Sequence, residues 1–153
     1  FNGDALCNLC HPSAAATGKA LFTDFSYDNL GLPANPEVDA LLGYDALPDY
    51  GLGGFLRGTG VEEYVAAADA ADGAFKVPTL RNIELTAPYF HSGRSWDLRQ
   101  AVEVMAASQL GLPVNEEEAG KIVAFLGALT GDQPTVVYPV LPPSVAATPR
   151  PQP

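Results

Sequence analysis

Residues 96–108 carry a clear pattern of apolar and polar positions. Four apolar side chains recur there at i, i+3, i+4 and i+7, the spacing that places them on one face of an α-helix: Leu98, Ala101, Val102 and Met105. Ser95 precedes the segment and is the expected N-cap, with Asp97 in the first turn, where the helix dipole favours an anion. The pattern therefore predicts a helix with one apolar face.

A second helix is predicted over residues 116–130. Asn115 is its expected N-cap, three glutamates follow in the first turn, and Gly131 is the expected stop. Its apolar residues again share one face, as a helix that packs against a core requires: Ile122, Phe125, Leu126 and Leu129.

The first half of the chain is less regular. Residues 61–73 contain helix formers and end at Gly73, whereas no strand-rich region or internal repeat is visible. The remaining segments are predicted as an ordered loop (21–36), a short helix (37–43), a Gly-rich turning segment (47–55), and extended segments and loops (75–95). The expected fold class is mostly α, with long loops.

The composition changes at Asp132. Seven of the 14 prolines lie in residues 134–153, which excludes a helix there and predicts an extended or disordered tail. Residues 1–131 are then one domain, as expected for a chain of 153 residues.

The charge balance limits the partners. The chain has 18 Asp and Glu against 8 Lys and Arg, a net charge of -10, which argues against nucleic acid and against an anionic membrane surface. No apolar run is long enough to cross a bilayer, and no signal peptide is visible. Phe1 already lies close to candidate chemistry. We therefore expect a mature or cut piece of a larger protein, or a lone domain.

That candidate chemistry is the motif C-x-x-C-H, formed by Cys7, Cys10 and His11. A spacing of three and four residues brings all three side chains to one face of a helical turn. Two thioether bonds to one haem edge, with the histidine beneath the iron, fit this spacing, and the motif is typical of c-type haem attachment. Such attachment takes place outside the cytoplasm, which predicts a periplasmic or other extracytoplasmic protein.

Other interpretations of the motif fit less well. A thioredoxin-like disulfide pair needs alternating strands and helices, which the pattern does not contain. A zinc site needs four ligands, and only His91 and carboxylates remain to complete one. Coincidence is the third alternative.

The residues leave two candidates for the ligand on the other side of the iron. The candidates are Met105, the only methionine, and His91, the only other histidine. A methionine ligand favours electron transfer. Met105 could equally be a core side chain and His91 a structural histidine in its turn, so the spacing alone favours Met105 only slightly.

The segment 75–111 resembles the C-terminal half of bacterial di-haem cytochrome c peroxidases. The shared motifs are K-V-P-T-L-R-N (76–82), L-T-A-P-Y-F-H-S-G (85–93) and A-V-x-x-M-x-x-x-Q-L-G (101–111), and the likeness extends over most of residues 5–131. The resemblance implies a cytochrome c-type domain with one high-potential, electron-transferring haem c, held by His11 and Met105. In that family the peroxide-reducing haem lies in a separate N-terminal domain.

The resemblance also implies a calcium ion between the two haem domains, partly held by backbone carbonyls of a T-A-P segment that Thr86 and Pro88 match. The other ligands belong to the second domain, so calcium is not expected in this chain alone. The implied partner is a second haem domain or a small redox protein.

Three more residues are candidates near the haem. Arg81 or Arg94 could pair with a haem propionate, with ordinary surface pairing as the alternative. Trp96 could line an electron path at the haem edge, although core packing is the more usual role of a single tryptophan. None of these residues is predicted to be catalytic.

The sequence therefore predicts a monohaem domain that transfers single electrons. The alternatives are part of a hydrogen-peroxide-reducing enzyme whose second haem domain is not in this chain, with His91 assisting proton transfer, and a haem-based sensor of a diatomic gas.

Overall fold

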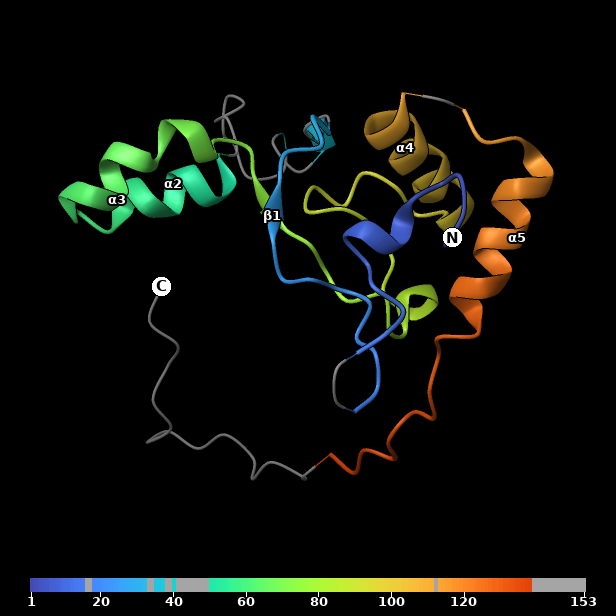
Figure 1. Cartoon of the computed structure of the whole chain (residues 1–153). Coiled ribbons are helices and arrows are strands. Elements are labelled where there is room, and N and C mark those ends of the chain that lie inside the picture. Colours follow the sequence, from blue (N-terminus) through green and yellow to red (C-terminus); the bar gives the residue numbers. More distant parts are fainter. Residues whose placement is uncertain (16–17, 33–34, 38–39, 41–49, 112, 139–153) are drawn as a thin grey trace.

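The structure, a computed structural model, describes residues 1–15, 18–32, 35–37, 40, 50–111 and 113–138. The regular structure within these residues is mostly helical with little strand, as predicted (Figure 1). The elements, in chain order, are the 3₁₀ turn η1 (Cys7–Leu9), strand β1 (Tyr27–Asp28), helices α2 (Gly51–Gly58) and α3 (Glu62–Ala67), the 3₁₀ turn η2 (Asp69–Ala71), strand β2 (Phe75–Lys76), the 3₁₀ turn η3 (Ile83–Leu85), and helices α4 (Leu98–Leu110) and α5 (Glu116–Gly127).

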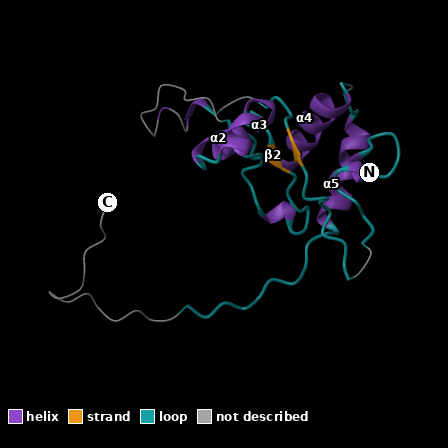
Figure 2. Ribbon diagram, turned by 60° about the vertical axis from the view of Figure 1, so that its left-hand side comes forward, coloured by secondary structure: helices purple, strands orange, loops and turns teal. Residues whose placement is uncertain are grey.

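Helix α5 and the turn that follows it supply three of the four residues of the buried core cluster. Its residues Ile122 and Leu126, together with Leu129 just beyond the helix, form a buried cluster with Phe22, so the predicted apolar face is confirmed. The ring of Phe1 packs against the same cluster, with its centroid 4.6 Å from that of Phe125. Helices α4 and α5 pack against each other beside the N-terminal coil (Figure 2).

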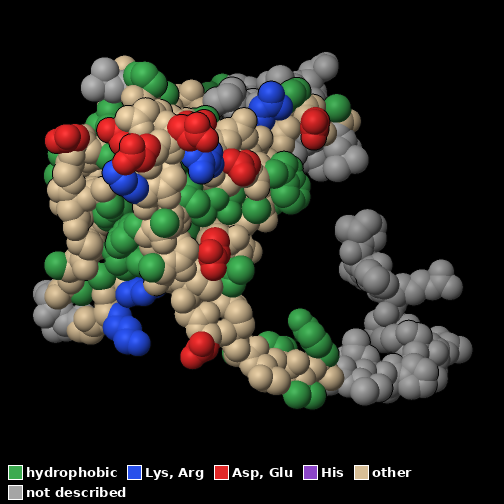
Figure 3. All heavy atoms as spheres, turned by 90° about the vertical axis from the view of Figure 1, so that its right-hand side faces the viewer, with side chains coloured by type: hydrophobic (Ala, Val, Ile, Leu, Met, Phe, Trp, Pro, Cys, Tyr) green, Lys and Arg blue, Asp and Glu red, His purple; other side chains and the backbone are tan. Residues whose placement is uncertain are grey.

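The predicted cap of α5 is confirmed. The side chain of Asn115 accepts a hydrogen bond from the amide of Glu118, and the Glu118 carboxylate accepts one from the amide of Asn115, which is a capping box. The first-turn glutamates lie where the helix dipole favours anions, and acidic side chains gather at the upper end of the face shown in Figure 3. The helix ends at Gly127, three residues earlier than predicted, because the backbone continues as turns tied to Asn82.

The predicted cap of α4 is wrong. Asp97, not Ser95, is the N-cap, because its carboxylate accepts a hydrogen bond of 2.8 Å from the amide of Gln100. Ser95 is buried and extended, and its carbonyl accepts a hydrogen bond of 2.6 Å from the amide of Tyr89. Because Ser95 is held in this bridge with Tyr89, it cannot also cap α4, which begins at Leu98.

The Gly-rich segment is helical rather than turning. Residues 51–58 form α2, and residues 47–49 of the predicted turn lie outside the described residues. Gly53 allows α2 to lie close to Ala68 and Asp72. A Cβ at Gly53 would meet the side chain of Asp72 and lie 2.6 Å from the carbonyl of Ala68. Packing of α2 against α3 and η2 thus overrides the low helix propensity of glycine.

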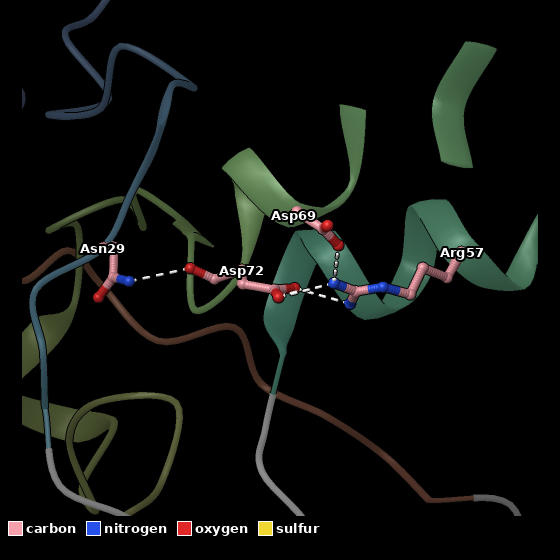
Figure 4. A network of polar contacts seen from close by, with 4 residues as sticks. All are labelled: Asn29, Arg57, Asp69 and Asp72. Carbon is pink, nitrogen blue, oxygen red and sulfur yellow. Dashed lines mark hydrogen bonds and ion pairs between the residues drawn. The ribbon is translucent and has the colours of Figure 1, made fainter. Parts of the chain in front are cut away.

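An ionic network fixes this pair of helices (Figure 4). The guanidinium of Arg57 donates two hydrogen bonds, of 2.7 and 2.6 Å, to the carboxylate of Asp72 and one of 2.7 Å to Asp69. Arg57 thereby lowers the pKa of the Asp72 carboxyl below its usual value. The side-chain amide of Asn29 donates a hydrogen bond to the backbone carbonyl of Asp72 and so connects the network to the segment that follows β1. Of the predicted helical segment 61–73, only Glu62–Ala67 is α-helix. The chain continues as η2 and a turn that reaches Gly73, where φ is 70°, so the α-helix ends earlier than predicted.

The remaining segments are mostly loops. Strands β1 and β2 form a short antiparallel ribbon in which Tyr27 pairs with Lys76. Residues 38–39 and 41–43 of the predicted short helix lie outside the described residues, as do 139–153 of the tail, whereas residues 132–138 have neither helix nor strand. None of the helices in the described part of the chain is long and apolar enough to cross a bilayer.

Candidate cofactor site

A cavity of about 890 Å³ lies between the N-terminal turn, the β-ribbon, the segment after β2, and helices α4 and α5. Its lining comes from five separate parts of the chain and is largely apolar. The volume lies in the upper part of the range for protein sites that enclose a cofactor or ligand. The described residues thus form a shell around one large apolar site.

The C-x-x-C-H motif lies on one wall of this cavity. Cys7, Cys10 and His11 all line it, and the turn η1 brings them together as their spacing predicts. The amide of His11 donates a hydrogen bond of 2.9 Å to the carbonyl of Cys7, so the motif completes one helical turn. Both cysteines are free thiols. Burial raises the pKa of each thiol, and Asp24 and Asp28 add a smaller effect at Cys10.

The imidazole of His11 is oriented by a backbone carbonyl. Its Nδ1 lies 2.8 Å from the carbonyl oxygen of Phe22. Because a carbonyl only accepts, Nδ1 carries the proton and Nε2 keeps its lone pair for a metal ion. Burial lowers the pKa of His11, which further favours the neutral imidazole that metals bind.

Helix α4 forms a second wall. Its apolar face points into the cavity, and Met105 lines the cavity together with its helical neighbours Leu98, Ala101 and Val102. Gln109, one turn further along, donates a hydrogen bond of 2.9 Å to Asp28 on β1 and so connects this wall to the ribbon. The structure therefore brings the methionine and the C-x-x-C-H turn to the same cavity.

His91 reaches the same cavity. Its ring stacks on Phe75, with centroids 3.5 Å apart and planes within 5° of each other. Both residues named as candidates for the second iron ligand therefore lie at the site, and the cavity by itself does not choose between them.

Of the three other candidate residues, only Arg81 lines the cavity. Arg81 lines the cavity, donates from Nε to the carbonyl of Ala20 over 2.9 Å, and lies over the ring of Phe22. Arg94 and Trp96 do not line it. Trp96 is 74% exposed, so the expected core packing is wrong. It directly precedes Asp97, the N-cap of α4, and so lies outside the helix and its apolar face.

Sequence reasoning missed two parts of the site. Phe75, although it stands beside the recognised K-V-P-T-L-R-N motif, was not singled out as a wall of the cavity. The carbonyl of Phe22 that orients His11 carries no side-chain signal, because any residue has that group and only the fold places it.

Metal-binding groups are sparse elsewhere. In the described ranges, no group of three or more His, Cys, Asp and Glu residues comes together as an ion site. Thr86 and Pro88 line the main cavity next to the cis peptide bond between Ala87 and Pro88.

The residues present fit a covalently attached haem. The cavity is large and apolar, two thiols and an imidazole with a fixed proton position share one wall, and a thioether lies on another. A mostly helical fold built around such a site defines the class of c-type cytochrome domains.

Comparison with known proteins specifies the class further. No family model matches the chain. The chain is 57% identical over 89 residues to the cytochrome c551 peroxidase of Nitrosomonas europaea, an alignment that covers 58% of this chain and 27% of that protein. It is 39% identical over 149 residues to the cytochrome c551 peroxidase of Pseudomonas aeruginosa, covering 97% of this chain and 37% of that protein. The methylamine utilization protein MauG of Paracoccus denitrificans is 39% identical over 98 residues, or 63% of this chain and 24% of MauG.

The chain is thus a haem-binding domain of the cytochrome c peroxidase type. It spans less than two fifths of the length of each of these three relatives.

Proposed function

We propose that this chain carries one haem c, bound through thioether bonds to Cys7 and Cys10, and that it works as a single-electron relay. The observation that carries the proposal is the shared cavity, which joins the C-x-x-C-H turn to Met105 of α4. The haem, when bound, supplies a reversible one-electron iron couple.

The chain's own residues would do the rest. Nε2 of His11 would bind the iron, with its ring direction set by the carbonyl of Phe22. Met105 would bind on the other side, and the apolar face of α4 would exclude water. Arg81 is the candidate partner for a propionate, because it lines the cavity and its guanidinium is already oriented by Ala20.

Met105 is preferred to His91 because a thioether stabilises the reduced iron and suits electron transfer. The stack of His91 on Phe75 gives that ring a packing role at the site. The resemblance of residues 101–111 to the A-V-x-x-M motif supports the same assignment.

The alternative function is part of a hydrogen-peroxide-reducing enzyme. Two of the relatives described above are named cytochrome c551 peroxidases and are more than twice as long as this chain. In that arrangement the domain corresponds to the C-terminal, electron-transferring one, and a second haem domain would be its partner. A calcium ion near Thr86 and Pro88 would then need ligands from that second domain. We propose a periplasmic location, where covalent haem attachment takes place.

Absorption spectra of the Met105→Ala variant test the ligand set. The holo-chain is expected to show the weak far-red band of methionine–ferric ligation and to be unchanged by peroxide or carbon monoxide. Met105→Ala should lose the band and bind carbon monoxide, because the iron would then lack its thioether ligand.

Val104→Ala is the matched control, since Val104 lies on α4 but does not line the cavity, and it should keep the band. A Met105→Ala variant that keeps the band would contradict the assignment. A wild-type spectrum that responds to peroxide would favour the peroxidase alternative.

A further inference from the structure

One hydrogen bond connects the helix that carries Met105 to the β-ribbon. The side-chain amide of Gln109, on α4, donates a hydrogen bond of 2.9 Å to the carboxylate of Asp28, on β1. Both residues line the cavity and both are exposed, so the bond lies at the rim of the cavity. Because the two residues are 81 positions apart in the sequence, the bond restrains two segments that no local structure holds together.

Gln109 lies one helical turn after Met105. Residues four apart on a helix share a face, and Val102, Met105 and Gln109 all line the cavity from α4. A shift of this part of the helix would therefore move the Met105 thioether and the Gln109 amide together. The position of the Met105 sulfur thus depends on where Gln109 is held.

The other side-chain hydrogen bonds of α4 lie near its start. Arg99 donates one of 3.0 Å to the carbonyl of Glu116, and Gln100 accepts one of 2.9 Å from Ser95. In the C-terminal half of α4, Gln109 is the only described residue whose side chain forms a hydrogen bond. Apart from apolar packing, this bond is therefore what restrains the half of the helix that carries Met105.

The Asp28 end of the bond is firmly held. Asp28 pairs with Phe75 in the β-ribbon. The next residue, Asn29, donates a hydrogen bond of 2.9 Å from its side chain to the carbonyl of Asp72 (Figure 4). Since the ribbon is fixed on this side, the bond from Gln109 restrains α4 rather than the ribbon.

We propose that Gln109 is a positioning residue for Met105: its bond to Asp28 holds the C-terminal half of α4 against the β-ribbon and so keeps the thioether on the haem iron. The inference rests on the proposed ligand set of His11 and Met105. Release of Met105 then requires the bond between Gln109 and Asp28 to break. When an external ligand replaces Met105, the iron–sulfur bond breaks, a bond from the iron to that ligand forms, and no electron is transferred.

Stopped-flow binding of imidazole to the oxidised holo-chain measures the release of Met105. At saturating imidazole the observed rate reaches a plateau, which is the rate at which the methionine leaves the iron. Gln109→Leu keeps the approximate size of the side chain but removes the donor. It should raise the plateau about fivefold, the factor that corresponds to one hydrogen bond of about 1 kcal/mol.

Gln100→Leu is the matched control, because it is the same substitution on the same helix at a residue that does not line the cavity. Its plateau should stay within about twofold of the wild type, as expected for a change at a distant, independent site. The far-red band and the circular dichroism of each variant confirm that it starts folded and with methionine bound.

Asp28 supplies the second half of the test. Asp28→Ala removes the acceptor and should raise the plateau as much as Gln109→Leu does. The double variant should be no faster than either single variant, because all three lack the same bond. Asp28→Asn keeps a carbonyl that accepts the bond, so its plateau should lie closer to the wild type than that of Asp28→Ala. If Gln109→Leu attaches no haem, the two Asp28 variants still measure the bond.

Two results would overturn the role of Gln109: a plateau for Gln109→Leu within twofold of the wild type, or fully additive effects of Gln109→Leu and Asp28→Ala. Either leaves the ligand set intact. A wild-type holo-chain without the far-red band would instead contradict the proposed function, because Gln109 would then have no bound methionine to position.

Discussion

At the scale of the residue, one side chain of the loop that orients His11 connects this loop to the segment after β2. The hydroxyl of Thr23 donates a hydrogen bond of 2.7 Å to the carbonyl of Val77 and accepts one of 3.0 Å from the amide of Phe25. Both Thr23 and Val77 are buried. Since the carbonyl that receives His11 belongs to the neighbouring Phe22, the position of the imidazole depends on this buried contact.

Thr23→Val tests that dependence. The variant keeps the shape but leaves the amide of Phe25 without the hydroxyl and the carbonyl of Val77 with only a longer bond of 3.4 Å from Lys76, so the free energy of unfolding should fall by about 1–3 kcal/mol. Chemical denaturation measures it. Thr59→Val is the control, because the Thr59 hydroxyl bonds a carbonyl at an exposed helix end, and its effect should stay within about 0.5 kcal/mol. Equal effects of the two substitutions would argue against a special role for the Thr23 contact.

At the scale of the element, the pair α2–α3 depends on one glycine. Gly53 is buried at the crossing, where a Cβ would lie 2.6 Å from the carbonyl of Ala68 and 2.9 Å from the amide of Asp72. Gly58, at the end of the same helix, has nothing within 4 Å of the place a Cβ would take. The two positions separate the effect of close packing from that of helix propensity.

Substitution by alanine should act in opposite directions at these two positions. Gly53→Ala should destabilise the chain by about 1–3 kcal/mol through overpacking against backbone. Gly58→Ala should stabilise it by about 0.4–1 kcal/mol, because it restricts the unfolded chain without a clash. Thermal unfolding of the holo-chain gives both values. A neutral Gly53→Ala would mean that the helices separate easily.

At the scale of the whole molecule, the described residues bury few large apolar side chains compared with the volume of the cavity that they surround. Ten apolar residues are buried in the described part, four of them are alanines, and none of the large side chains is fully buried. The cavity of about 890 Å³ touches almost every element that carries core residues. A folded protein does not keep an unfilled apolar space of that size, because its lining would lose too many contacts.

Loss of haem attachment should therefore unfold the domain. In the double variant Cys7→Ser and Cys10→Ser, the cooperative thermal transition and the near-ultraviolet circular dichroism should be lost, while some far-ultraviolet signal from α4 and α5 remains. Asn8→Ser, in the same turn, keeps both thiols and should unfold like the wild type. A sharp transition in the double variant would show that the chain folds without its cofactor attached.

Local patterns determined much of this picture. The capping box at Asn115 and the apolar faces of α4 and α5 depend on neighbouring residues, so periodicity and capping rules predict them. The joining of Cys7, Cys10 and His11 in one turn is local as well, because helical spacing alone brings them together. The sequence also carried the likeness to cytochrome c peroxidases that the comparisons confirm.

Long-range packing decided the rest. Residues 51–58 contain glycines typical of a turn, yet they form a helix because Gly53 fits against Ala68 and Asp72. Asp97 rather than Ser95 caps α4, because Ser95 pairs with Tyr89. Only the tertiary structure brought the Phe22 carbonyl to His11, gathered Met105 and His91 at one cavity, and stacked Phe75 on His91, since these contacts join residues that no local rule connects.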